Sequence, residues 1–331
     1  MDGRDVMAGH PTGVTEQRTD RRASPARAGG LSHSALLYRS DDEYRAGLAE
    51  FVRGAAAVGA PTQVMLARHR LQLAGAALAA LPLRVVLDDM AEVGRNPARL
   101  IPAGQSFADD YPGEHVYCLW EPAWPGRSVA ERREIARHEG LCNLAFSDRA
   151  MTVLCLYDAA RLSAELIAEA ELTHPMVISR GWPRSSATYL GPGQLPASCD
   201  RPLPLVPAAA ESLSFTDQLG AVRDFVAQQA GEAGLSLARG RDLTLAVSEV
   251  AANAVSYANG GAIRAWRADG DLICQVEDSG FIRDPLAGRR LRAPDTPGGH
   301  GLWLVNLVCD LVERRTSPSG TTTRLHMRVT S

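Results

Sequence analysis

One segment, residues 241–260, constrains this chain more than any other because its apolar residues recur at the period of a helix. It reads RDLTLAVSEVAANAVSYANG, and one face is apolar: Leu243, Ala246, Val247, Val250 and Ala254. Glu249 and Asn253 are spaced i and i+4, so they lie together at the edge of that face. Polar groups in such a place lose hydration unless something binds them. Two interpretations remain open: a ligand-binding helix, or an amphipathic helix with two solvated polar residues.

The residue types at this edge suit a particular chemistry. An asparagine oxygen can coordinate a hard cation such as Mg²⁺, and a glutamate can hold or deprotonate a water or hydroxyl. A predicted strand at 272–276, LICQV, then leads into Glu277, Asp278, Ser279 and Gly280. The sequence therefore predicts a tight turn that carries a carboxylate directly after a strand.

Two further segments complete the pattern. Glycines surround His300 in the run GGHG, and an apolar-periodic helix is expected at 302–312. A glycine-rich approach to a helix N-terminus leaves backbone N–H groups free, which favours phosphate binding. A closing strand is predicted where three threonines follow Gly320, with Leu325, Met327 and Val329 alternating after them.

In this order the four motifs, E-x-x-x-N, D-x-G, G-x-G-L and G-T-T, resemble the GHKL ATP-binding fold of histidine kinases, gyrase and heat-shock chaperones. Residues 212–328 look most like its anti-sigma-factor serine kinase branch. The resemblance implies a two-layer α/β sandwich (the Bergerat fold) for the C-terminal part. It also implies ATP and Mg²⁺ as cofactors.

The resemblance also implies roles for individual residues. Asn253 would coordinate the Mg²⁺ that bridges the phosphates, and Glu249 would be the catalytic base. Asp278 would accept a hydrogen bond from the adenine amino group, with Gly280 letting the backbone approach the base. The remaining nucleotide-binding positions are two glycines and a leucine at the phosphates and two threonines near the adenine: Gly299, Gly301, Leu302, Thr322 and Thr323.

Two positions depart from the family pattern. The first glycine box usually has a second glycine where this chain has Ile282, and many kinase-branch members have a histidine where it has Tyr257. These departures favour nucleotide binding over catalysis. They leave open a non-catalytic regulator that sequesters a sigma factor or antagonist with nucleotide as a structural element.

The N-terminal half alternates predicted strands with predicted helices, which indicates an α/β domain with a mainly parallel sheet. Helices are expected to begin at the caps Ser40 and Ser128, each with a glutamate three residues on. The segments HSALLYRSDDEYRAGLAEF, EPAWPGRS, RHEGLCN, LCLYD and THP are similar to the MEDS-type sensory domain, over residues 33–177. Such domains precede kinase-like ATPases in regulators of methylotrophs, methanogens and actinomycetes, which implies a possible small-molecule ligand.

Candidate residues for that ligand lie at predicted strand ends. The loop from Glu121 to Arg127 presents an acid, a tryptophan and a guanidinium, which would either line a pocket or pair among themselves around a closed core. His138 and Glu139 on one helix, with His33 and His174 far away in sequence, raise the alternative of a metal. Their spacing matches no metal-binding helix motif, so the sequence does not favour one.

Composition limits the other function classes. The chain has 331 residues, all 35 of its basic residues are Arg, and its net charge of −3 gives no reason to expect nucleic acid. The six cysteines show no C-x-x-C pairing and are expected to be reduced and buried. No apolar run is long enough for a membrane span, and the N-terminus has no apolar signal core, so we expect a cytoplasmic protein without membrane contact.

These observations predict four parts: a disordered tail at 1–30, a MEDS-like α/β domain at 31–180, a Pro/Gly-rich linker at 181–211 and a GHKL domain at 212–331. The expected function is an ATP-dependent serine/threonine kinase acting on an anti-sigma factor antagonist, or a sigma-factor-binding regulator, controlled by the sensory domain. A homodimer is possible. A histidine kinase is disfavoured, because no helical pair with a phosphoacceptor histidine precedes residue 212.

Overall fold

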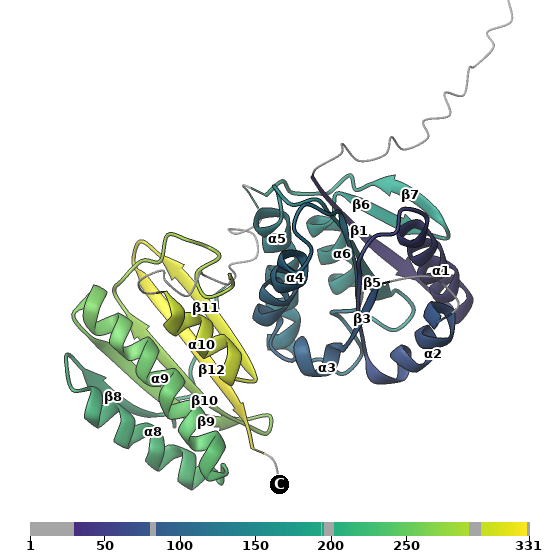
Figure 1. Ribbon diagram of the computed structural model, residues 1–331. Helices are drawn as coiled ribbons and strands as arrows, with labels where there is room; N and C mark the ends of the chain where they lie inside the picture. The colour runs from purple at the N-terminus through teal and green to yellow at the C-terminus, as the bar shows by residue number, and fades with distance from the viewer. Residues whose placement is uncertain (1–29, 80–83, 193, 195–201, 291–298, 330–331) are drawn as a thin grey trace, which may run out of the picture.

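The computed structural model describes residues 30–79, 84–192, 194, 202–290 and 299–329. It has two lobes, each built around its own sheet (Figure 1). The tail predicted at 1–30 lies almost wholly outside the described residues. Among the helices of the described segments, none has the length and apolar character that crossing a membrane requires.

The N-terminal lobe contains a seven-stranded sheet in the order β3-β2-β4-β5-β1-β6-β7. Each neighbouring pair is parallel except β6 and β7, which are antiparallel. This confirms the predicted α/β domain with a mainly parallel sheet. Its strands are β1 (Leu31–Tyr38), β2 (Thr62–Leu66), β3 (Val85–Asp89), β4 (Val116–Trp120), β5 (Met151–Asp158), β6 (Met176–Ser179) and β7 (Trp182–Ser185).

Helices cover both faces of this sheet, as a buried parallel sheet requires. One face packs with α1 through Tyr44, Leu48 and Val52. The other packs with α4, α5 and α6 around a larger apolar cluster that includes Trp120 and Phe146. The helices are α1 (Asp41–Ala57), α2 (Arg68–Ala79), α3 (Met90–Val93), the 3₁₀ turn η1 (Pro97–Arg99), α4 (Leu100–Asp109), α5 (Val129–Ala145) and α6 (Ala164–Thr173).

The predicted helix caps form, with one difference. Ser128 and Glu131 make the complete reciprocal capping box at the start of α5. At α1 the Ser40 hydroxyl accepts from the Glu43 N–H, but the Glu43 carboxylate accepts from the backbone N–H of Arg39. Only half of the predicted box at Ser40 is therefore present.

The C-terminal lobe is a two-layer sandwich, as the GHKL resemblance predicted. Its sheet has the order β11-β12-β10-β9-β8 with every neighbouring pair antiparallel. The strands are β8 (Glu211–Phe215), β9 (Gly261–Ala268), β10 (Asp271–Asp278), β11 (Leu311–Ser317) and β12 (Gly320–Arg328). The helices α8 (Leu219–Ala233), α9 (Leu237–Ala258) and α10 (His300–Val308) lie over one face (Figure 1).

One element boundary differs from the sequence prediction. The helix expected at 302–312 ends at Val308, and Leu311 begins β11, because Cys309 is extended and Asp310 pairs with Arg239. Elsewhere in this lobe, Phe215 ends β8 before α8 begins. Only three residues separate α8, which ends at Ala233, from α9, which Ser236 caps.

The segment expected to be a linker, 181–211, contains ordered structure at both ends. Trp182–Ser185 pairs as β7 with β6, and Glu211 begins β8. Between them, Pro204 accepts a hydrogen bond at its carbonyl from Arg324 of β12. This part of the chain therefore lies against the C-terminal sheet.

Candidate functional site

The helix predicted to carry the site is α9. Ala246, Val250 and Ala254 are buried in the core of the lobe, and Glu249 and Asn253 are half-buried along the edge of that face. Tyr257, one turn beyond Asn253, is 82% exposed. The helix ends at Asn259, which adopts the left-handed conformation that asparagine tolerates better than most residues.

Glu249 lies directly against the first turn of α10. A Cβ atom at position 301 would be 2.4 Å from Glu249 Oε2, so the glycine lets the Glu249 carboxylate lie against the start of α10. Gly299 caps α10 with a φ of 80°. The free N–H groups of this helix start, including that of Gly301, therefore open beside the glutamate. Leu302 packs on the core of the lobe.

Asp278 ends β10 in the predicted turn. The N–H of Gly280 donates to Asp278 Oδ1 over 2.7 Å. Burial raises the pKa of Asp278, and this hydrogen bond opposes the rise. A Cβ atom at position 280 would be 2.9 Å from the same oxygen, so a side chain there would displace the Asp278 carboxylate.

The strand threonines divide between the two faces of the sheet. Leu325 and Met327 belong to the core beneath the helices, so Thr323 and Thr321 point to the helix side and Thr322 points away. Thr322 lines a cavity of about 420 Å³ on the other side, together with Glu277 and Arg315. Thr322 pairs with Glu277 across the ladder, and Asp278 lines the same cavity.

Thr321 is the residue that the sequence analysis missed. It pairs with Asp278 across the ladder, and its hydroxyl donates to the carbonyl of Gly280 over 2.8 Å. Thr316 is 2.8 Å from Thr321 and accepts from the N–H of Ile282 over 3.0 Å. Counting the strand alternation back from Leu325 would have identified Thr321.

The structure brings most of the predicted residues together along α9. At one end Glu249 contacts Gly301, and at the other end Ser279 donates to the carbonyl of Ala258. The nine helical steps from residue 249 to residue 258 span about 14 Å, and Asn253 lies between the two ends. An elongated ligand that has an anionic end beside Gly301 and a hydrogen-bonding end at Asp278 matches this spacing. Residues 291–298 lie outside the described residues.

The segment after Gly280 leaves the site and enters the N-terminal lobe. Leu286, only 2% exposed, belongs to the same buried cluster as Ile101 and Ile135 of that lobe. The carbonyl of Gly288 accepts from Asn306 of α10 over 2.8 Å, and Asn96 donates to the Asn306 carbonyl over 2.9 Å. Residues 281–290, called here the docking loop, therefore connect the turn at Asp278 to the other domain.

A buried ion-pair network closes this interface. Glu134 of α5 is fully buried; its Oε2 accepts from Arg289 of the docking loop and its Oε1 from Arg315 of β11 over 2.8 Å. Burial raises the pKa of Glu134, but attraction to Arg289, Arg315 and Arg137 outweighs burial and holds the pKa below its usual value. The Arg289 side chain is only 3% exposed, so it belongs to this interface and not to a solvated loop surface.

Burial lowers the pKa of the neighbouring Arg314 to about 9, and repulsion from Arg137 and Arg289 adds to this effect. The interface thus gathers four arginines around one carboxylate. Buried like charges repel one another strongly, so the negative charge of Glu134 stabilises this cluster of arginines.

A second ion-pair network lies beside it on the helix-free face of the C-terminal sheet. Arg133 of α5 donates to Glu313 over 2.7 Å, and His326 Nε2 is 3.1 Å from the other carboxylate oxygen. Burial raises the pKa of Glu313, but hydrogen bonds from His326 and Arg133 outweigh it and lower the pKa to about 2. Burial lowers the pKa of His326, but hydrogen bonds to Asp271 and Glu313 outweigh it and raise the pKa above its usual value.

In the N-terminal lobe, the loop from Glu121 to Arg127 is folded on itself. The Arg127 guanidinium lies 3.5 Å from the ring centre of Trp124 and donates to the carbonyl of Gly94 over 2.8 Å. Glu121 accepts from Tyr38 over 2.9 Å, and burial raises its pKa to about 7. Of the two alternatives for this loop, the contacts match the closed one, although Arg127 pairs with Glu131 and not with Glu121.

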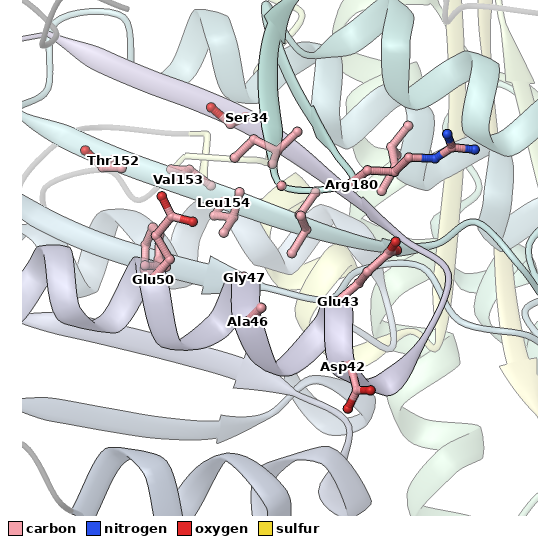
Figure 2. Close-up of a pocket in the computed structure, with 15 residues that line it drawn as sticks. Ser34, Asp42, Glu43, Ala46, Gly47, Glu50, Thr152, Val153, Leu154 and Arg180 are labelled. Carbon is pink, nitrogen blue, oxygen red and sulfur yellow. The ribbon is translucent and has the colours of Figure 1, made fainter. Parts of the chain in front are cut away.

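A cavity of about 630 Å³ lies between α1 and the strands β1 and β5 (Figure 2). Leu36 and Leu154 form part of an apolar wall, while Glu43, Glu50 and Arg180 bring charge to its rim. Position 47 has no side chain here because a Cβ would be 2.3 Å from Leu36. The sequence analysis did not find this cavity, because most of its lining residues carry no recognisable chemical pattern.

The fold and the site define a two-domain protein in which an α/β domain contacts a GHKL-type sandwich. Residues 32–175 match the family model described as MEDS, the methanogen/methylotroph, DcmR sensory domain. Residues 214–327 match the model of the histidine kinase-like ATPase domain. The chain therefore joins a MEDS domain to a histidine kinase-like ATPase domain, as the two resemblances predicted.

Two solved structures are similar to parts of this chain. The RsbU and RsbW domains of Rv1364c from Mycobacterium tuberculosis share 22% identity with a TM-score of 0.27, over 37% of this chain and 33% of that one. The Acinetobacter baumannii histidine kinase AdeS shares 13% identity with a TM-score of 0.23, over 38% and 70%. The match thus spans about a third of the first structure's length. Among curated proteins, none matches this chain.

The two adjacent arginines of the docking loop give a matched test of the interface. Arg289→Ala should lower the free energy of unfolding by about 3–5 kcal/mol, because it breaks a buried ion pair. Arg290→Ala should change it by less than about 0.5 kcal/mol, because that side chain is exposed. Urea denaturation of the full chain measures both. Equal effects of the two substitutions would contradict the assignment of Arg289 to the interface.

Stability should also depend on pH through His326. A raised folded pKa contributes stability that is complete below the unfolded value of about 6.5 and is lost as pH rises through the folded pKa. Glu313 contributes above about pH 4.5 and loses its contribution as pH falls toward 2. We therefore expect the melting temperature of the wild type to decrease as the pH rises above neutral.

The His326→Gln variant should show a smaller fall over the same range. The control is His115→Gln, because burial lowers the pKa of His115 and its contribution has the opposite sign. Thermal midpoints between pH 5 and 9 measure both variants. If the melting temperatures of His326→Gln and of the wild type decrease by the same amount over this range, His326 is not the source of the pH dependence.

Proposed function

We propose that this protein is an ATP-binding regulator of the anti-sigma-factor type, which transfers the γ-phosphoryl group of ATP to a serine or threonine of an anti-sigma antagonist. The observation that carries the proposal is the arrangement along α9. Glu249 adjoins the glycine start of α10 at Gly301, and Asp278 lies at the other end of the same helix. The histidine kinase-like family of this domain supports the same cofactor.

In the proposed complex, ATP lies along α9. Its adenine amino group donates to Asp278, and Gly280 and Thr321 hold the turn that presents this carboxylate. Its phosphates lie at the N-terminus of α10, where Gly299 and Gly301 leave backbone N–H groups free. Asn253 holds Mg²⁺ on the phosphates. The metal and the nucleotide supply the charge neutralisation and the transferable phosphoryl group.

Glu249 is the proposed base. A hydroxyl group of the partner that approaches the γ-phosphate beside Gly301 would come within reach of Glu249 Oε2. This oxygen would accept the hydroxyl proton as the new O–P bond forms and the bond from the γ-phosphorus to the β–γ bridging oxygen breaks, with ADP as the leaving group. The closeness of this oxygen to position 301 supports the role, because it places the base at the phosphate end. The partner is a protein, and its identity is proposed from the sequence resemblance alone.

We further propose that the MEDS domain regulates the ATPase domain through the docking loop. This loop begins three residues after Asp278, carries Leu286 into the core of the MEDS domain, and contains the Arg289 that pairs with Glu134. A small molecule in the cavity between α1 and the sheet is the proposed input (Figure 2). Its charged rim favours a ligand with a polar group on an apolar body.

A second function has one observation in its favour. Tyr257, which replaces the histidine of many kinase-branch relatives, is 82% exposed, so it is free to contact another protein and takes no part in the site described. In this alternative the nucleotide stabilises a surface that sequesters a sigma factor or antagonist, without phosphoryl transfer. The two functions share the ATP site and differ only in the reaction.

Substitutions of Asp278, of its neighbour Glu277 on β10 and of Asn253 test ATP binding. Asp278→Asn and Asn253→Ala should each weaken the binding of ATP with Mg²⁺ at least about tenfold, equivalent to about 1.4 kcal/mol. Glu277→Gln should keep wild-type affinity, because Glu277 points to the opposite face and pairs with Arg264. Isothermal titration calorimetry measures all four proteins. Absence of binding to the wild type would refute the nucleotide site.

The role of Glu249 is tested by measuring ATP binding and the rate of phosphoryl transfer separately. Glu249→Gln should bind ATP within about threefold of wild type but transfer phosphate about 100-fold more slowly, because it removes a general base. Transfer from γ-labelled ATP to candidate antagonist proteins measures the rate. If the wild type binds ATP and a partner but transfers nothing, the sequestering function is correct and the kinase is not.

A further inference from the structure

Four side chains that are far apart in sequence meet inside the MEDS domain. His33 comes from β1, Glu139 from α5, Cys155 from β5, and His174 from the residue that ends α6. Each is at most 2% exposed. The cluster lies on the α5 face of the sheet, opposite the face that α1 covers.

The potential ligand atoms converge on one small volume. His33 Nε2 and His174 Nε2 are 3.3 and 3.4 Å from the same atom, Glu139 Oε2. Cys155 Sγ is 3.5 Å from that oxygen and 3.5 Å from His33 Nε2. In a tetrahedral site with bonds of about 2.0–2.3 Å, neighbouring ligand atoms are about 3.3–3.8 Å apart. The observed separations match this geometry.

The hydrogen bonds of the two imidazoles fix their tautomers. His33 Nδ1 is 3.1 Å from Asn143 Oδ1. The orientation of that amide is set by its NH₂ group, which donates to the carbonyls of Thr173 and Glu139. His174 Nδ1 is 2.8 Å from the carbonyl of Ala170. Both Nδ1 atoms therefore carry the proton, and a neutral ring presents a lone pair at Nε2.

Without a cation this arrangement is unfavourable. The two Nε2 lone pairs would face a carboxylate oxygen, and within the described part of the chain His174 Nε2 has no hydrogen-bond partner. Protonating both rings would instead bury two cations beside one carboxylate. A divalent cation among the four ligand atoms removes the conflict.

A supporting shell completes the site. Tyr157 donates to Glu139 Oε1 over 2.8 Å, which leaves Oε2 as the single oxygen directed at the cluster. Each imidazole has its outer nitrogen held by an amide or backbone oxygen. Metal sites in proteins orient their histidines and carboxylates in the same way.

We propose that His33, Glu139, Cys155 and His174 bind one divalent transition-metal ion of the zinc class in a closed, four-ligand site. Imidazole nitrogen and thiolate sulfur are the ligands that such ions prefer, and four protein ligands without an open position are typical of a structural ion. Because the thiolate is the form that ligates such ions, the Cys155 thiol releases its proton to solvent as the ion binds. The four proposed ligands come from separate segments of the chain, so their spacing in the sequence matches no metal-binding motif.

The first test measures metal in the full chain purified without chelator. Mass spectrometry of the metal content should find about one zinc per chain, the stoichiometry of a single closed site. After replacement by Co²⁺, the protein should show the visible bands of tetrahedral cobalt and a sulfur-to-cobalt charge-transfer band. A wild type that takes up neither ion in stoichiometric amount overturns the proposal.

Variants then locate the ion. Cys155→Ser should lose the charge-transfer band and the bound metal, whereas Cys118→Ser, equally buried in the same sheet, should keep both. Asn143→Ala should lower Co²⁺ affinity about 10–100-fold, because it removes the partner of His33 and leaves the four ligands in place. This variant keeps the test decisive if Cys155→Ser fails to fold. Metal retained equally in all variants would mean an adventitious ion only and would overturn the assignment.

Discussion

The arrangement of the two domains depends on one buried carboxylate, Glu134. It accepts from Arg289 of the docking loop and from Arg315 of β11, and it has no exposed surface. A charge without water must be paired, so the helix, the loop and the strand can occupy this place only together. Removing the glutamate would leave several arginines facing one another. The domain interface is therefore a specific arrangement that has few alternatives.

The ion pair between Glu134 and Arg289 also connects the proposed nucleotide site of the ATPase domain to the core of the MEDS domain. The docking loop starts beside Asp278 and ends at Glu134, and α5, which carries Glu134, also carries Glu139 of the proposed metal site. A shift of α5 would therefore act on both places. The proposed control of the ATPase domain needs no additional element, because the loop follows the proposed nucleotide site in sequence and packs into the MEDS domain.

The sequence predicted what local patterns determine and missed what tertiary contacts determine. The i, i+4 spacing of Glu249 and Asn253 placed both on α9, and the capping box at Ser128 began α5 as expected. The apolar run after Leu302 fits a helix or a buried strand, and only the pairing of β11 with β12 decides where α10 ends. The positions of Arg289 and of the histidine cluster depend on contacts across more than a hundred residues, which no periodicity encodes.

The central claim is that the docking loop links the nucleotide site to the MEDS domain. Hydrogen–deuterium exchange of the full chain, with and without ATP and Mg²⁺, tests it most directly. We predict that nucleotide changes the exchange of residues 281–290 and also of α5 around Glu134, and that Arg289→Ala confines the change to the ATPase domain. A wild type in which nucleotide alters exchange only within residues 211–279 and 299–329 would contradict the account.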